Sequence, residues 1–166
     1  MRLKINIREL DDIHISLLPD LFNNNCFYFK TKRPESLNEG CIRELVKNKN
    51  SKTFLVFLDE SIYGIIAFEN DRFDQKAVAL NLAFKDIDFL TNNIDELSKF
   101  IYELICDKYD SIKVSVYDFD NLGKKFCDTL SFEVEAILKK HVFKYDTYHD
   151  VIVYTKNIKS WRDSID

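Results

Sequence analysis

Three consecutive stretches in the middle of the chain have the composition of buried strands, and they constrain the fold more than any other feature. Residues 53–58, 62–69 and 77–84 are rich in apolar, β-branched and aromatic side chains, and short polar segments separate them. Short apolar runs bounded by turn-forming residues are typical of strands buried in a sheet. We therefore expect one β-meander at the centre of the molecule.

The segments on both sides of this meander carry further strand and helix signals. Residues 3–7 alternate apolar and polar side chains, Asp12 is an expected helix N-cap, and residues 36–48 begin with capping-box spacing. After the meander we expect a helix capped by Asn93, a strand over 111–117, a helix capped by Asp120 or Asn121, and strands over 132–143 and 148–156. The order β-α-α-β-β-β-α-β-α-β-β indicates an α+β fold with a single sheet.

The composition is that of one globular domain. Of the 166 residues, 46% are hydrophobic and 31% are charged, which excludes a disordered chain and predicts a single domain over residues 1–166. The 24 basic and 28 acidic side chains give a net charge of −4, so we expect no nucleic-acid partner. No apolar run approaches the ~20 residues that span a bilayer. We expect a cytoplasmic protein without a membrane partner.

Several common functional motifs are missing. The glycines Gly40, Gly64 and Gly123 are isolated from one another, which excludes a P-loop and a Rossmann dinucleotide fingerprint. The histidines and cysteines have no metal-ligand spacing, so we expect no metal site and four reduced cysteines.

The C-terminal third carries a family resemblance. The segment VSVYDFDNLGKKFCDTLSFEVEAILKKHVF and the ending YHDVIVYTKNIKSW resemble the GNAT N-acetyltransferase superfamily, in particular the branch of the ribosomal-protein N-terminal acetyltransferases. The order of elements matches over the whole chain. The resemblance implies the acyl-CoA N-acyltransferase fold, which is a mixed, mostly antiparallel sheet flanked by helices. It also implies acetyl transfer from acetyl-CoA to a primary amine of a small molecule or peptide.

The resemblance also assigns cofactor-binding roles. Acetyl-CoA would enter a gap between the strands that end near Phe84 and Val116. The residues implied are Leu82, Ala83 and Phe84 for the thioester and pantetheine arm, a helix start at Asn92 and Asn93 for the pyrophosphate, and Asn121 for the pantetheine end. Lys124 and Lys125 are candidates to contact the phosphates of coenzyme A, and the alternative for both is a solvated helix face.

The most specific motif of the family is absent. Members hold the pyrophosphate with a loop R/Q-x-x-G-x-G/A, whereas this chain has KDIDFLTNN, without glycine or arginine, at that position. Glycine lets backbone amides approach a phosphate closely, and the carboxylates of Asp86 and Asp88 would repel it.

The catalytic residues of the family are also replaced. Ala79 stands where many members have a glutamate base, and Cys127 or Asp128 stands at the position of the tyrosine acid. Glu69 is a candidate base and Cys127 a candidate proton donor. The alternatives are an exposed strand-end carboxylate and a buried thiol. The hydroxyls of Tyr117 and Tyr154 are further candidates, and both tyrosines also fit the core.

Two hypotheses of function remain open. The first is an N-acetyltransferase, in which orientation in a dry slot matters more than a strong acid or base. The second is a catalytically inactive binding or regulatory module, in which Phe84 or Phe89 closes the cleft near residues 85–93. The resemblance places the choice of acceptor in residues 23–35. An exposed strand could also pair two copies into a homodimer.

Overall fold

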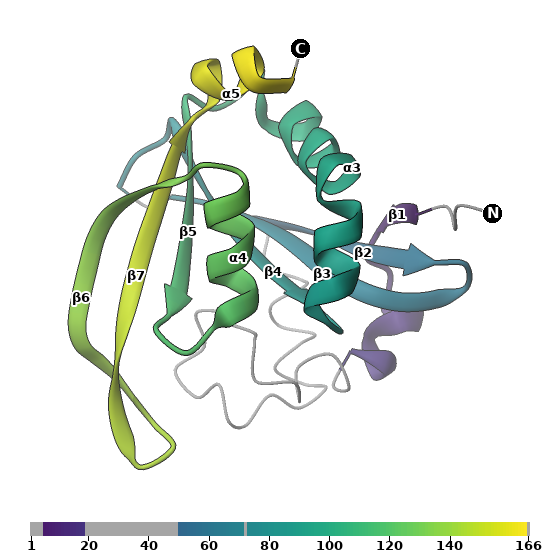
Figure 1. The fold of residues 1–166 in the computed structure, drawn as a ribbon. Coiled ribbons are helices and arrows are strands. Elements are labelled where there is room, and N and C mark those ends of the chain that lie inside the picture. Colours follow the sequence, from purple (N-terminus) through teal and green to yellow (C-terminus); the bar gives the residue numbers. More distant parts are fainter. Residues whose placement is uncertain (1–4, 19–49, 72, 166) are drawn as a thin grey trace.

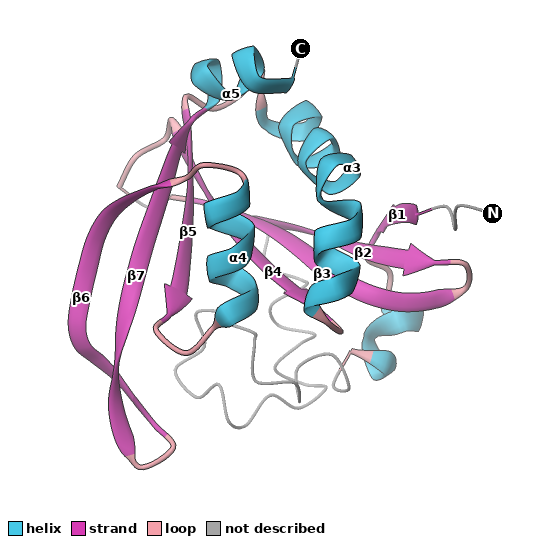
Figure 2. Ribbon diagram, in the orientation of Figure 1, coloured by secondary structure: helices cyan, strands magenta, loops and turns pink. Residues whose placement is uncertain are grey.

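A computed structural model describes residues 5–18, 50–71 and 73–165. The described residues form a single β-sheet, and helices pack against the faces of this sheet (Figures 1 and 2). In chain order the elements are β1 (Ile5–Glu9), the 3₁₀ helix η1 (Asp12–Leu17), β2 (Ser51–Leu58), β3 (Ser61–Asn70), β4 (Ala77–Phe84), α3 (Ile87–Ile105), β5 (Ser111–Tyr117), α4 (Asn121–Thr129), β6 (Glu133–Lys144), β7 (Thr147–Asn157) and α5 (Ile158–Ile165).

The sheet is mixed and mostly antiparallel. Its seven strands follow the order β1-β2-β3-β4-β5-β7-β6, and the pairing of β4 with β5 is parallel whereas the other pairings are antiparallel. Helix α3 makes the crossover between the two parallel strands, as a parallel connection requires. The expected α+β class and the central meander of β2, β3 and β4 are confirmed.

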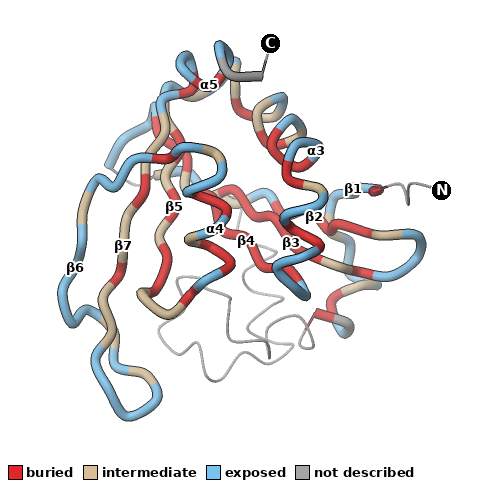
Figure 3. Tube along the Cα trace, viewed as in Figure 1, coloured by how far each residue is buried: buried red, intermediate tan, exposed pale blue. Residues whose placement is uncertain are grey.

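Each face of the sheet has its own apolar cluster. On one face, Phe84, Val114 and other strand residues pack against α3, α4 and α5. On the opposite face, Ile15 and Leu18 from the η1 region pack on Leu55 and Ile65. Figure 3 shows that the central strands are mostly buried, whereas β6, which forms an edge of the sheet, is largely exposed. This burial on both faces explains why β2, β3 and β4 are nearly continuously apolar.

The strand predictions agree closely with the structure, and the helix predictions agree less well. Strands 77–84 and 111–117 have the expected bounds. The N-cap of η1 is Asp11, not Asp12, and α3 starts at Ile87 with Asp86 as its N-cap, so the expected start at Asn93 is wrong. The helix expected over 36–48 lies outside the described residues, and the final helix α5 was not expected.

A tight turn joins β6 to β7. Lys144 pairs with Thr147, so only Tyr145 and Asp146 form the loop, and their φ angles are 52° and 60°. Two positive φ angles are the mark of a type I′ turn, whose backbone twist matches the strands of a hairpin. Here both positions are occupied by residues other than glycine, and the rest of the hairpin must hold them there.

Candidate functional site

The two parallel strands part before they end. Their pairing runs from Ala77 opposite Ser111 to Leu80 opposite Val114. Beyond that point β4 stays paired with β3 as far as Phe84, and β5 stays paired with β7 as far as Tyr117. The backbone groups of residues 82–84 that face β5 therefore have no partner in that strand. This divergence is the gap that the resemblance implied.

The gap is narrow and partly polar. It is lined by Leu80, Asn81, Leu82, Val114, Ser115, Val116, Asp120 and Gly123, and its cavity measures about 10 Å³, which is room for about one water. The side chains of Asn81 and Asp120 are only 7% and 4% exposed. A buried polar group needs a partner, and within the described residues the Asn81 amide has no hydrogen bond. The gap therefore contains a buried polar side chain on each of its two sides, Asn81 from β4 and Asp120 from the start of α4.

Asp120 is the ionisable group of this gap. It is the N-cap of α4, and its Oδ1 accepts a hydrogen bond of 2.8 Å from the backbone N–H of Gly123. Burial disfavours the charged carboxylate and raises the pKa of Asp120 to about 6, although the Gly123 N–H and Lys124 act in the other direction. A carboxyl group with this pKa exchanges its proton near neutral pH, which suits acid–base chemistry.

Gly123 allows α4 to approach β5 at this point. A Cβ atom on residue 123 would lie 2.6 Å from Asp120 Oδ2 and 2.6 Å from Val116 Cγ1. Such distances are far inside van der Waals contact, so any side chain would displace either the carboxyl group or the helix. The isolated glycine of the sequence therefore has a packing role beside the gap.

The start of α3 differs from the phosphate site that the sequence predicted. The Asp86 carboxylate accepts a hydrogen bond of 2.6 Å from the backbone N–H of Phe89, and Asp88 lies in the same first turn. Asn92 and Asn93 lie farther along the helix, and the side-chain amide of Asn93 donates to the carbonyl of Phe89. The expected role of these asparagines at a helix start is therefore corrected. Two carboxylates now occupy the position where a pyrophosphate would bind.

Aromatic rings fill the space between β3, β4 and α3. A Cβ atom on residue 64 would lie only 2.2 Å from Cδ1 of the Phe84 ring, so the ring takes up the space beside Gly64. The Phe89 ring centroid lies 5.9 Å from that of Phe84 and 4.9 Å from that of Tyr63. Phe84 and Phe89 thus close this side of β4, as the second hypothesis expected. No residue that lines the gap between β4 and β5 is aromatic.

Glu69 lies next to the position of the missing family glutamate. It is directly opposite Ala79 in the pairing of β3 with β4, and directly opposite side chains point to the same face about 5 Å apart. Ala79 is one residue before the last paired residue of β4, Leu80. Glu69 is half-buried, and it lies on the same face of the sheet as Asn81. The structure thus brings the candidate base near the opening of the gap.

Cys127 and Tyr154 lie in the core. The Cys127 side chain is fully buried, and its burial, with Asp128 and Asp120 nearby, raises the pKa of the thiol. Burial likewise raises the pKa of Tyr154, which is 6% exposed. Neither residue lines the gap, so the alternative of a buried thiol fits the structure better than a proton donor at residue 127.

Asn121 and Lys124 lie at the start of α4. Asn121 is the exposed first residue of the helix. The ammonium group of Lys124 donates a hydrogen bond to the backbone carbonyl of Asp118, so it holds the loop between β5 and α4 in the structure. Of these two residues, Asn121 is the one that lies open beside the gap. The described residues contain no cluster of side chains that could hold a metal ion.

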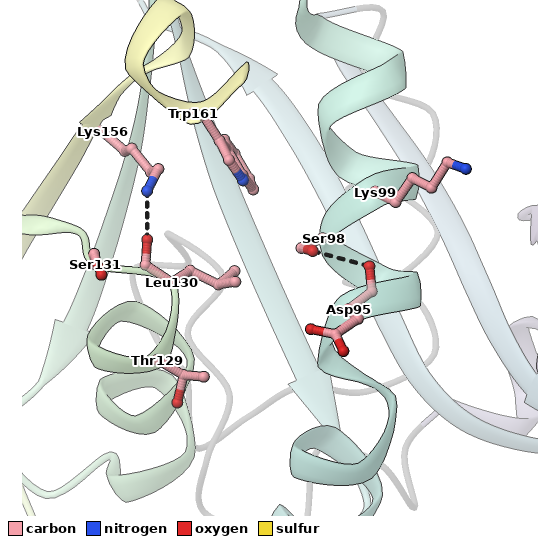
Figure 4. Close-up of a pocket in the computed structure, with 8 residues that line it drawn as sticks. All are labelled: Asp95, Ser98, Lys99, Thr129, Leu130, Ser131, Lys156 and Trp161. Atoms are coloured by element: carbon pink, nitrogen blue, oxygen red, sulfur yellow. Dashed lines mark hydrogen bonds between the residues drawn. The ribbon is translucent and has the colours of Figure 1, made fainter. Parts of the chain in front are cut away.

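A larger pocket lies between α3, the end of α4 and Trp161 (Figure 4). It measures about 440 Å³. The Lys156 ammonium donates to the carbonyl of Leu130 at the end of α4, and burial lowers the pKa of that ammonium. The pocket includes none of the residues predicted from the sequence. Because the Lys156 ammonium is already bound to the Leu130 carbonyl, we assign this pocket no chemistry.

Solved structures share this architecture. A spermidine N-acetyltransferase from Vibrio cholerae, solved with CoA and spermine, superposes with a TM-score of 0.76 at 14% identity over 95% of this chain and 98% of that chain. An N-acetyltransferase from Staphylococcus aureus Mu50 has a TM-score of 0.69 at 17% identity, covering 94% and 99%. The ribosomal L7/L12 acetyltransferase RimL has a TM-score of 0.69 at 16% identity, covering 93% of each chain.

The chain has the fold of the GNAT N-acetyltransferases. No protein-family model and no curated protein sequence matches it, so the likeness to GNAT proteins is one of structure. The fold implied by the C-terminal segments is confirmed. None of the described helices is long and apolar enough to cross a membrane.

Sequence reasoning missed two polar residues of the gap in this GNAT fold. Asp120 was expected as a helix cap, and nothing in the local sequence indicates that the cap is buried. Asn81 is a single polar residue in the apolar run of β4, and that interruption was the available signal. A polar side chain in a strand buried on both faces needs a reason, and here it lines the gap.

Proposed function

We propose that the protein is an N-acetyltransferase that transfers the acetyl group of acetyl-CoA to a primary amine. The observation that carries this proposal is the divergence of β4 from β5 after Leu80 and Val114. Among the described residues, it leaves strand-edge backbone groups without a partner in the neighbouring strand, and buried backbone groups are nearly always hydrogen-bonded. An extended arm with amide groups, such as pantetheine, would satisfy them.

The residues of the gap suit a direct transfer. Backbone groups of residues 82–84 would hold the arm, and Asn121 at the start of α4 would contact it. The amine nitrogen attacks the thioester carbon, the C–S bond breaks, and the sulfur departs as a thiolate. The attacking nitrogen must lose a proton and the thiolate must gain one.

Two carboxyl groups are our candidates for these proton transfers. Asp120 lines the gap, and with a pKa of about 6 it can deliver a proton to the thiolate. Glu69, which lies directly opposite Ala79 in the pairing of β3 with β4, would take the proton from the amine. Asp120 would act as the general acid and Glu69 as the general base.

One feature supports the second candidate, an inactive binding module. Asp86 and Asp88 at the start of α3 oppose a pyrophosphate, and Phe84 and Phe89 fill the space beside them. An enzyme with this helix start would depend on the pantetheine arm, not on the nucleotide, for its affinity. An inactive module would bind neither part.

Calorimetry with two ligands tests both candidates. S-acetylpantetheine contains the arm without the nucleotide, and we expect it to bind with an affinity within a few-fold of that of acetyl-CoA. Release of free thiol from acetyl-CoA in the presence of a panel of primary amines then measures transfer. If neither ligand gives detectable heat at millimolar concentration, the transferase proposal is wrong and the inactive module stands.

A further inference from the structure

An aromatic cluster surrounds a lysine ammonium beyond the end of β5. The Nζ atom of Lys144 lies 5.8 Å from the ring centroid of Tyr117, 5.6 Å from that of Phe119 and 4.8 Å from that of Tyr145. The Tyr117 and Phe119 rings stack at 5.0 Å, and the Tyr145 ring meets Phe119 edge-on at 5.7 Å. We call these three rings the aromatic cage.

Three rings around one cation form an electrostatic site. A cation within about 6 Å of an aromatic centroid is attracted by the negative face of the ring, and several rings together recognise ammonium groups in proteins. Within the described residues, the Lys144 ammonium forms no ion pair within 4.0 Å, so the rings are its main partners. The cage therefore favours an organic cation whichever molecule supplies it.

The cage lies close to the gap. Ser115, which lines the gap, and Tyr117 are two residues apart on β5, so they point to the same face with Cα atoms roughly 7 Å apart. Asn81 and Glu69 point to this face as well, because the pairing of β3 with β4 puts them on the side away from α3. A molecule held in the cage would extend toward the unpaired end of β4.

A side-chain contact from His149 holds the backbone of Lys144 independently of the lysine side chain. The ring of His149 contacts the Lys144 carbonyl through Nε2 at 3.1 Å and Asp118 Oδ1 through Nδ1 at 2.9 Å. A second oxygen of Asp118 accepts from the backbone N–H of Asp150. These contacts hold the hairpin against β5, and the flexible stem of Lys144 can swing out without disturbing them.

We propose that the aromatic cage is the subsite for a cationic group of the acceptor, and that Lys144 occupies it until the acceptor arrives. The inference rests on the proposed function and names its acceptor class, an amine that carries a second, positively charged nitrogen. The cage holds the charged nitrogen while the other, uncharged amine faces the gap. Lys144 is then an internal competitor that the acceptor must displace.

Binding of choline tests the cage without any acetyl transfer. Choline has a permanent charge and cannot be N-acetylated, and 3,3-dimethylbutan-1-ol is its neutral isostere. In an NMR titration we expect Lys144→Met to bind choline about tenfold more tightly than the unchanged protein, because the competing cation is gone. The neutral isostere should gain no more than twofold. The double variant Lys144→Met with Phe119→Leu should lose the gain.

Lys52→Met is the matched control. The Lys52 ammonium lies 5.6 Å from the centroid of one ring only, that of Phe54, so its removal should not create choline binding. Thermal unfolding of each variant confirms that it is folded. If Lys144→Met gains no affinity for choline, or gains equally for the isostere, the cage proposal is overturned.

A kinetic arm separates this proposal from the proposed function. With acetyl-CoA as donor, Lys144→Met should lower the KM for 1,5-diaminopentane several-fold relative to that for pentylamine. If Lys144→Met binds choline more tightly but neither amine is acetylated, the cage proposal stands and the transferase proposal is wrong. If transfer occurs and Lys144→Met changes both KM values by the same factor, the transferase proposal stands and the cage proposal is overturned.

Discussion

The two helices that follow the parallel strands begin in the same way and differ in one respect. Asp86 caps α3 after β4, and Asp120 caps α4 after β5. Both carboxylates accept a hydrogen bond from the N–H group three residues ahead. Asp86 is exposed, whereas Asp120 is 4% exposed and its pKa is raised to about 6 by burial. The same capping motif gives an exposed carboxyl group at one helix and a buried carboxyl group with a raised pKa at the other.

The comparison shows that burial, not the motif, decides the chemistry. A cap stabilises a helix whether water reaches it or not. Here it is the exclusion of water that disfavours the charged carboxylate, raises its pKa and makes its proton available near neutral pH. In this molecule the divergence of β4 from β5 places one cap inside the sheet, next to Ser115 and Asn81.

The largest expected effect is a difference in acetyl-transfer activity between variants of the two helix caps. Asp120→Asn keeps a capping side chain but cannot donate a proton, so we expect kcat to fall about 100-fold, as when a general acid is lost. Asp86→Asn should leave kcat unchanged at saturating acetyl-CoA. Steady-state release of thiol measures both variants. Equal kcat values for Asp120→Asn and the unchanged protein would remove Asp120 from the mechanism.

The second effect is on stability and its dependence on pH. The folded pKa of Asp120 is about 6, above its ordinary value of 3.8. The unfolded chain therefore binds fewer protons between these values, and the free energy of unfolding falls as pH rises through that window. Asp120→Asn lacks this loss. The stability of the variant minus that of the unchanged protein should therefore be about 2 kcal/mol more favourable at pH 7.5 than at pH 4.

Urea unfolding at the two pH values gives this difference. Other carboxylates, among them Asp118 and Asp150, have lowered pKa values. Burial would raise the pKa of Asp118, but the hydrogen bonds from the Asp150 N–H and from His149 lower it. The pKa of Asp150 is lowered mainly by its hydrogen bond with Lys139. Their contribution is lost in acid and is common to both proteins, so it cancels.

A smaller effect concerns the glycine beside the buried cap. Alanine is normally better than glycine inside a helix by about 1 kcal/mol. Gly123→Ala should instead destabilise the protein by about 1 kcal/mol, because the clash with Asp120 Oδ2 and Val116 Cγ1 costs more than the helix gains. Chemical unfolding measures the change. A stabilised variant would mean that Asp120 can leave its position at little cost.

The smallest effect concerns the exposed cap. Asp86→Asn removes a negative charge from the start of α3 and keeps the cap, so it should tighten acetyl-CoA binding two- to fivefold, in line with the energy of a charge near a helix end. The affinity for S-acetylpantetheine should not change, because that ligand has no pyrophosphate. Calorimetry at low salt compares the two ligands, and an equal change for both would place the pyrophosphate elsewhere.

The strands could be predicted well because their composition is a direct result of their burial. Strand β4 is apolar except at Asn81, because α3 covers one face and the η1 cluster lies on the other. The start of α3 was placed wrongly because the sequence holds two capping signals, Asp86 and Asn93. Phe89 and Leu90, which are 5% and 0% exposed, extend the buried face of the helix back to the first signal and decide between them.

The site was harder to predict because its parts come from distant segments. The burial of Asp120 depends on where β4 leaves β5, and no local pattern records that point. The aromatic cage joins Tyr117 and Phe119 to Tyr145 through the pairing of Val151 with Tyr117 and the tight turn of the hairpin. Local sequence predicts each strand, but the contacts between strands are set by register.

The four paired residues of β4 and β5 have a mechanical consequence. This ladder is the only one described between the β1–β4 part of the sheet and the β5–β7 part, and α3 lies in the connection between its two strands. Long-range pairings of this kind form late in folding because a large loop has to close first. Amide protons at this seam should therefore exchange with solvent before those of the neighbouring antiparallel ladders, and the protein would begin to open where its substrate is expected to enter.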